Sequence, residues 1–184
     1  MALAHTILAL LAKHPDSGYE ISKHFDEELS CYWKATQQQV YRELGKLEKQ
    51  GWASYETVPQ AGKPDKKLYH ITDLGWKELT RWYAEPTEPT PIREDLLVKV
   101  LIGHKMPRQL LAQELHHRQQ IHSDKLARYR EIESAHFSSG KNDAEMQFMY
   151  LTLKRGIAYE TSWLTWCDEV TKVITDASGE LTDG

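Results

Sequence analysis

The 184-residue chain has little of what secreted and membrane proteins rely on. Its only two cysteines, Cys31 and Cys167, lie far apart and form no metal-binding pattern, so we expect two reduced thiols. No run of about 18 apolar residues is present, so no membrane span is expected. The apolar start, residues 2–12, lacks a positively charged leading segment and a clear cleavage site, and therefore predicts a core helix rather than a signal peptide. These absences favour a cytoplasmic protein.

Recognisable catalytic chemistry is missing as well. The sequence contains no Ser-His-Asp grouping, no glycine-rich phosphate loop and no paired-carboxylate motif, so we expect neither an enzyme nor a cofactor. Several histidines fall close together in the second half of the chain, but no two of them stand four residues apart. We therefore expect a solvated helix face there and no metal site. These histidines are His116, His117, His122 and His136.

The chain also lacks an excess of basic residues, because its formal net charge is −4. That balance does not indicate a generic nucleic-acid binder. The charges are unevenly distributed, however, and residues 31–72 hold more basic than acidic side chains. A local basic face on an acidic chain is typical of selective nucleic-acid binding. The basic side chains of this region are Lys34, Arg42, Lys46, Lys49, Lys63, Lys66 and Lys67.

Residues 36–51 form the most informative stretch. Thr36 is a good helix N-cap and Gly51 a C-terminal stop. Val40, Leu44 and Leu47 recur at helical spacing, which predicts one apolar face that should not touch DNA. An ordinary amphipathic surface helix is the alternative to a recognition helix here.

The polar face of this segment favours recognition of DNA. Glutamine amides at a helix start can pair with an adenine edge in the major groove, whereas Tyr, Arg and Lys side chains reach phosphates. The expected base readers are Gln37, Gln38 and Gln39, and the expected phosphate contacts are Lys34, Tyr41, Arg42 and Lys46, beside the N-cap Thr36.

The flanking segments decide between the two interpretations. Residues 2–12 and 18–29 predict two helices, the second capped by Ser17, with Tyr19, Ile21, Phe25 and Leu29 facing inward. Residues 52–58 and 68–71 have strand composition and enclose a Gly/Pro turn, and Thr72 begins another helix that ends near Tyr83. This order is that of a winged helix-turn-helix, whose wing would hold Lys63, Lys66 and Lys67 against phosphates or in the minor groove.

The sequence resembles the PadR family of bacterial transcriptional regulators. Its most specific motifs are residues 18–21, which read Gly-Tyr-Glu-Ile, and residues 39–51, from Gln39 to Gly51. Residues 69–75, Leu79 and Trp82 match the wing and the helix that follows, and residues 93–101, Gly156 and residues 163–164 resemble the family's C-terminal helices. Trp52 departs from the aliphatic residue usual after the glycine. The resemblance implies a repressor, although a related branch activates virulence genes.

The second half predicts a helical dimerisation domain. Residues 85–91 contain three prolines and predict a stiff connector. Helices are expected over residues 92–103, from residues 106–107 through Ile132, and from about residue 143 to 174. The expected domains are 1–84, the DNA-binding domain; 85–91, the linker; 92–175, the dimerisation domain; and 176–184, a flexible tail. The fold class is thus mainly α with a small β-hairpin wing.

The long helices have an apolar stripe with few partners in their own subunit, which favours pairing with a twin across a two-fold axis. Gly156 would permit a close helix crossing. Tyr159, Trp163 and Trp166 share one helix face, which indicates packing at the dimer core or, alternatively, stacking of a flat aromatic ligand. Trp33, beside the recognition helix, would couple such a ligand to DNA.

The resulting hypothesis is a homodimeric, sequence-specific DNA-binding repressor. It would bind a two-fold-symmetric operator and be released from it by a small aromatic effector. Three alternatives remain: a winged-helix module that binds protein, an activator, and an enzyme with an unrecognised site. The basic wing and the glutamine-rich helix start disfavour the first of these, and the lack of clustered titratable residues disfavours the last.

Overall fold

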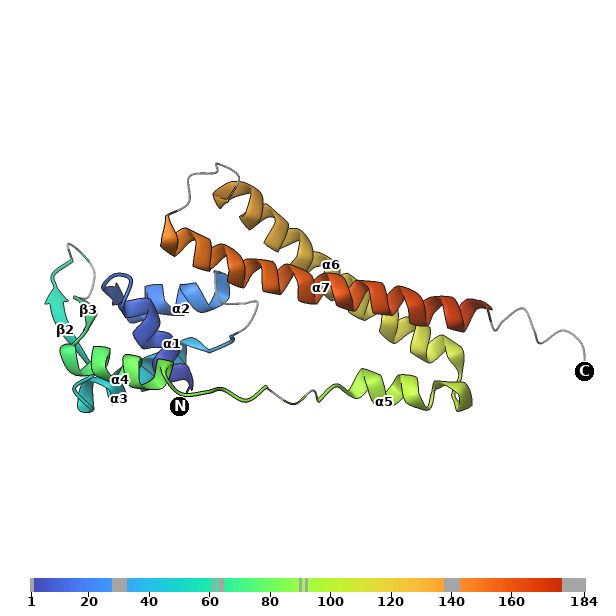
Figure 1. Cartoon of the computed structure of the whole chain (residues 1–184), viewed down its shortest axis with the longest axis horizontal. Coiled ribbons are helices and arrows are strands. Elements are labelled where there is room, and N and C mark those ends of the chain that lie inside the picture. The colour runs from blue at the N-terminus through green and yellow to red at the C-terminus, as the bar shows by residue number, and fades with distance from the viewer. Residues whose placement is uncertain are drawn as a thin grey trace, which may run out of the picture. The chain divides into compact units, whose positions relative to one another are not determined.

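The computed structural model describes residues 2–27, 33–60, 62, 65–89, 91, 93–137 and 143–176. The chain divides into two compact units, Met1–Pro89 and Thr90–Gly184 (Figure 1). The division falls inside the proline-rich connector. No helix in the described part of the chain combines the length and apolar character that crossing a membrane requires.

The first unit is a winged helix-turn-helix, as expected. Its helices α1, α2 and α3 are followed by the two wing strands and by α4 (Figure 1). The three strands form an antiparallel sheet in the order β1-β3-β2. The bounds are α1 Ala2–Leu11, β1 Asp16–Ser17, α2 Gly18–Glu27, α3 Gln37–Lys49, β2 Ala53–Val58, β3 Lys66–Ile71 and α4 Asp73–Tyr83.

Helix starts in this unit follow local capping chemistry. The Glu20 amide donates to Ser17 Oγ, and the Gly75 amide donates to Thr72 Oγ1, so both predicted caps are confirmed. Each bond satisfies one of the backbone N–H groups that a helix start leaves without a partner. At the other end of α3, Gly51 has φ +69°, the left-handed conformation that favours glycine after a helix.

The core of the first unit joins α1, α2 and α3. Its fully buried side chains include Ile7, Leu8, Ile21, Phe25, Val40, Leu44 and Leu47. The prediction that Tyr19 faces inward is wrong, since this side chain is 64% exposed. Tyr19 stands two residues from Ile21, which on a helix puts it on nearly the opposite side. The prediction for Leu29 lies outside the described residues.

Two features of the sheet were not predicted. Asp16 and Ser17 form the short strand β1, which pairs with Tyr69 and Leu68 of β3. Strand β3 also begins two residues earlier than expected, so that Lys66 and Lys67 pair with Val58 and Thr57 of β2. These two lysines therefore belong to a strand rather than to the turn, while Lys63 lies outside the described residues.

Adding a single methyl group at Gly75, near the start of α4, should have a large effect on the stability of the fold. A Cβ there would stand 2.1 Å from the Trp52 carbonyl oxygen, and this oxygen also accepts the Thr72 amide. Gly75→Ala should therefore lower the free energy of unfolding by about 1–3 kcal/mol, because the backbone at Trp52 must move. Gly45→Ala in α3 is the matched control.

At Gly45 a Cβ meets no atom within 4 Å. The control should stabilise the protein by up to about 1 kcal/mol, since alanine favours a helix more than glycine does. Urea unfolding of both variants measures the contrast. Equal stability of the two would show that the α4–Trp52 approach is not tight.

The second unit consists of helices. The short α5 (Asp95–Leu101) and the 3-10 turn η1 (Gly103–Lys105) precede α6 (Arg108–His136) and α7 (Ala144–Asp176), which lie against each other (Figure 1). The helix predicted over residues 92–103 is thus shorter, and Pro107 is the N-cap of α6 rather than its first residue. Leu96, Leu111, Leu115 and Cys167 form the core, with Trp163 and Trp166 packed against it.

Candidate nucleic-acid interface

Helix α3 presents one polar stripe directly opposite its buried side. Val40, Leu44 and Leu47 are fully buried. At 3.6 residues per turn, the positions opposite them are occupied by Gln38, Arg42 and Lys49. All three are exposed, and Gly45 completes the stripe without a side chain. The outward surface of this helix is therefore narrow, polar and basic toward its C-terminal end.

Gln39, unlike Gln37 and Gln38, forms hydrogen bonds that cap the start of α3. Its side-chain Oε1 accepts the Thr36 amide at 2.8 Å, while Thr36 Oγ1 accepts the Gln39 amide at 3.2 Å. This reciprocal pair is a capping box, which fixes the start of α3. The Thr36 cap is thereby confirmed. Gln37 and Gln38 stay exposed and have no such role.

Two further polar side chains on α3 also have contacts within the first unit. Tyr41 is half exposed, and its ring lies so close to Gly18, the first residue of α2, that a Cβ there would stand 2.7 Å from Tyr41 Cε1. Lys46 pairs with Glu43 at 2.7 Å. Lys34 is exposed in the segment before the helix.

The wing lysines differ from each other. Lys66 Nζ lies 2.9 Å from a carboxylate oxygen of Glu20, so it ties the wing to α2. The hydrogen bond from Lys66 lowers the pKa of Glu20 from 4.5 to about 2, and the pair therefore persists at neutral pH. Lys67 Nζ lies 3.7 Å above the centre of the Tyr55 ring, a cation–π contact at an exposed position. Lys67 is thus the more accessible cation of the two.

Some of these features have a signal in the sequence. Thr36 and Gln39 have the spacing of a capping box, as do Ser17 and Glu20. Lys49 completes the outward stripe of α3 at helical spacing but was not among the expected contacts. The Glu20–Lys66 pair had no such signal, because its partners stand 46 residues apart.

In the second unit, the predicted aromatic face is internally packed. The Trp163 ring stacks on His122 with centroids 5.1 Å apart, and it meets Trp166 edge to face at 5.3 Å. Tyr159 is 43% exposed and contacts Trp163 edge to face. Trp163 and Trp166 therefore support the core of their own chain. Trp33 likewise packs against the core of the first unit.

The expectation of a solvated histidine face is wrong for His122, which is 4% exposed. Its Nδ1 forms a hydrogen bond with the carboxylate of Glu160, itself 2% exposed. Lys125 Nζ lies 3.8 Å from the other oxygen of that carboxylate. Burial follows from the packing of α6 against α7. His116, His117 and His136 are exposed, as expected.

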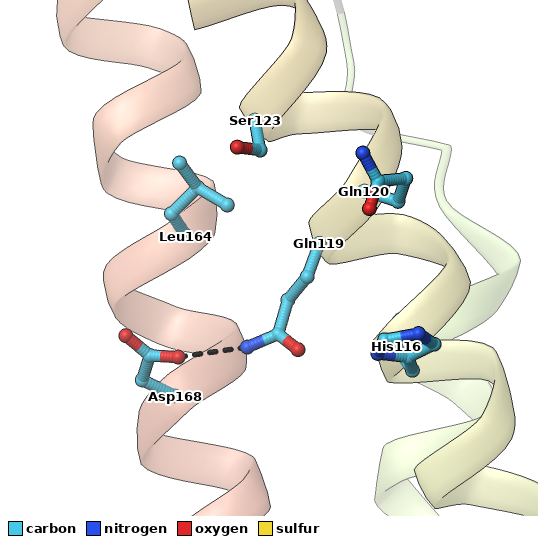
Figure 2. A pocket seen from close by; sticks show the side chains of 6 residues that line it. All are labelled: His116, Gln119, Gln120, Ser123, Leu164 and Asp168. Atoms are coloured by element: carbon cyan, nitrogen blue, oxygen red, sulfur yellow. Dashed lines mark hydrogen bonds between the residues drawn. The ribbon is translucent and has the colours of Figure 1, made fainter.

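An open hollow of about 350 Å³ lies between α6 and α7 (Figure 2). Five of the six residues that line it have polar side chains, and Gln119 donates to Asp168 across it at 2.7 Å. None of Tyr159, Trp163 and Trp166 lines this hollow. The aromatic face and the hollow are therefore separate features of the second unit.

A winged helix-turn-helix with a polar recognition helix, joined to a long helical hairpin, defines a class of DNA-binding transcriptional regulators. Residues 7–81 match the "Transcriptional regulator PadR-like family", and residues 92–175 match "Virulence activator alpha C-term". The chain is 38% identical to "Probable transcriptional regulator Rv1176c" of Mycobacterium tuberculosis, over 96% of this chain and 99% of that protein. The chain belongs to the PadR-like family of transcriptional regulators, which are not enzymes.

Solved structures of two proteins extend the comparison over nearly the whole chain. Bacillus subtilis PadR in complex with operator DNA has a TM-score of 0.82 and 28% identity, covering 95% of this chain and 99% of that one. The same protein, named "Negative transcriptional regulator PadR", has also been solved with p-coumaric acid. The virulence activator AphA of Vibrio cholerae has a TM-score of 0.79 and 28% identity over the same shares.

Proposed function

We propose that this DNA-binding regulator is a homodimeric repressor that recognises a two-fold-symmetric operator and acts in the cytoplasm. The observation on which the proposal rests is the stripe of Gln38, Arg42 and Lys49 opposite the buried side of α3. Repression, rather than activation, is supported by the similarity to the negative regulator of Bacillus subtilis.

Within the recognition helix, Gln38 is the foremost candidate for base contacts. It stands in the first turn of α3, where side chains reach base edges, and its amide is exposed. Arg42 lies one turn further along the same stripe, so we propose that it also approaches bases rather than only phosphates. Gln39 is disfavoured, because its amide oxygen closes the capping box. Gln37 is the remaining candidate.

The phosphate contacts in this proposal come from side chains around the stripe. Lys34 precedes α3, Tyr41 and Lys46 lie on α3 beside the stripe, and Lys67 extends from the wing strand β3. Lys66 contributes less, because its ammonium is paired with Glu20. Lys63 would extend this basic surface. These contacts position the protein on the duplex without reading its sequence.

The division between base and phosphate contacts is tested with two substitutions. Gln38→Ala should cost about 1–3 kcal/mol on the operator and little on random DNA, because it removes only a bond to a base. Lys67→Ala should weaken both complexes similarly. It should also make the fall of log K with log salt concentration less steep, by about 0.9 for each phosphate that the side chain no longer neutralises. Fluorescence anisotropy at several salt concentrations measures both quantities.

If Gln38→Ala reduces the affinity for operator and random DNA equally, Gln38 contacts the DNA phosphate backbone rather than a base. Failure of the wild-type chain to shift DNA from its own promoter region would favour the alternative of a protein-binding winged helix.

Exposed apolar side chains of the second unit support the proposed dimer. Leu101 and Val98 on α5 are 75% and 59% exposed, and Phe148 on α7 is 72% exposed. Val98 and Leu101 stand three residues apart on one face of α5, and adjoining exposed apolar side chains of this kind mark an interaction surface. A twin chain is the simplest occupant, because helix-turn-helix operators mirror a two-fold axis.

We further propose release from DNA by a small aromatic effector. The support is the p-coumaric acid complex of the Bacillus subtilis relative, together with the aromatic side chains of Trp33, Tyr159, Trp163 and Trp166. Their packing leaves Tyr159 as the most accessible of the three on α7. Adding p-coumaric acid to the operator complex is the direct measurement, and an unchanged affinity would exclude this phenol as the effector.

A further inference from the structure

Three side chains that can bind a metal ion converge in the first unit. Asp16 Oδ2 lies 3.1 Å from His14 Nδ1 and 3.1 Å from His24 Nε2. The three potential ligand atoms all lie within 4.8 Å of one another. Asp16 belongs to β1 and His24 to α2, so two of these groups stand on regular backbone.

These separations match those of a metal coordination sphere. Zinc binds imidazole nitrogen and carboxylate oxygen at about 2.0–2.2 Å, which puts neighbouring donor atoms of a tetrahedron about 3.3 Å apart. Both carboxylate–imidazole distances are close to this value. The two imidazole nitrogens need to approach each other, and the His14 side chain, which is 52% exposed, has room to move.

Burial separates this cluster from an ordinary surface grouping. The Asp16 side chain is only 9% exposed and that of His24 20% exposed. The next residue after His24, Phe25, is fully buried and fixes that turn of α2. The pairing of Asp16 with Tyr69 fixes the backbone of β1. The carboxylate is thus buried beside two imidazoles, and the half-exposed His14 side chain leaves the cluster accessible to water.

We propose that His14, Asp16 and His24 bind one divalent first-row transition metal ion, with zinc or cobalt as suitable ions and water in the fourth position. Two imidazoles and one carboxylate suit these ions, whereas magnesium and calcium prefer oxygen ligands alone. No sequence pattern predicted this site, because Asp16 and His24 stand eight residues apart on different elements, while His14 lies in the turn before β1.

The ion would brace the connection between α1 and α2. Helix α2 touches the recognition helix where Gly18 meets Tyr41, and it touches the wing through Glu20 and Lys66. A metal link from His14 to His24 therefore holds the helix on which both contacts depend. Metal binding stabilises the folded form, since the three ligands come together only on folding.

The test uses the full-length, tag-free chain after treatment with a chelator. Titration with Co²⁺ should give visible d–d absorption bands that saturate at one ion per chain, and Zn²⁺ should displace them. Zn²⁺ should also raise the melting temperature. His24→Ala and Asp16→Asn should each weaken binding at least about tenfold.

The matched control is His104→Ala, an exposed histidine of the second unit, which should bind Co²⁺ as the wild type does. His14→Ala is the ligand variant that should fold normally, because the half-exposed His14 ring contributes little to the core. Its metal-free melting temperature should be unchanged while its affinity for Co²⁺ falls. Absence of saturable Co²⁺ binding by the wild type, or undiminished binding by His14→Ala and His24→Ala, overturns the proposal.

Discussion

A chain cut after Pro89 should bind its operator about 10²–10⁴-fold more weakly than the full-length protein. The first unit has its own core, built from α1, α2 and α3, and should fold alone. In the proposed dimer, binding of one half-site holds the second recognition helix near the other half-site. Removing the link between the two copies removes this effective concentration without removing any DNA contact.

Sedimentation of the truncated chain should show a monomer, and a gel shift should show a single half-site complex. Binding to a DNA fragment with only one half-site should be nearly unchanged, which serves as the internal control. A truncated chain that stays dimeric and binds the operator normally would move the dimer interface into the first unit.

A point substitution can make the same test in the full-length chain. Trp163→Glu is unsuitable, because Trp163 packs against the core of its own chain and stacks on His122. Leu101→Glu is suitable, since Leu101 is 75% exposed and its replacement leaves the monomer core intact. A charge at a buried dimer contact has no partner there and should dissociate the dimer. Gln113→Glu, at an exposed position of α6, is the matched control.

The second large effect is expected at the buried pair of the helical hairpin. His122→Ala should lower the free energy of unfolding by about 3–5 kcal/mol, because it removes the partner of a carboxylate that stays buried. Lys125 Nζ, at 3.8 Å, is then the nearest cation left to Glu160. The substitution also removes the ring on which Trp163 stacks.

The matched control replaces both partners. His122→Leu combined with Glu160→Met fills similar volume without a buried charge, so it should restore most of the stability that His122→Ala removes. Urea unfolding at one fixed protein concentration compares the variants, since dimerisation makes stability depend on concentration. If the single variant is as stable as the wild type, the pair does not support the α6–α7 packing.

The recognition helix shows how far local sequence chemistry reaches. Thr36 and Gly51 mark its ends, and the spacing of Val40, Leu44 and Leu47 marks its buried side. Each of these signals lies within one or two turns of helix, where propensity and capping act. The winged-helix order followed from local signals of the same kind in the flanking segments. The choice among the glutamines was not made from the sequence, although the capping-box spacing of Thr36 and Gln39 already sets Gln39 apart.

The sequence by itself determined the fold class, the family resemblance and the buried side of α3, because these depend on motifs, periodicity and caps within short segments. Only the tertiary structure decided that Lys66 is tied to Glu20, that His122 is buried against Glu160, and that His14, Asp16 and His24 meet. In the first two, the partners stand 46 and 38 residues apart, and in the third Asp16 of β1 meets His24 of α2. Such contacts arise when separate elements pack, so no local pattern in the chain predicts them.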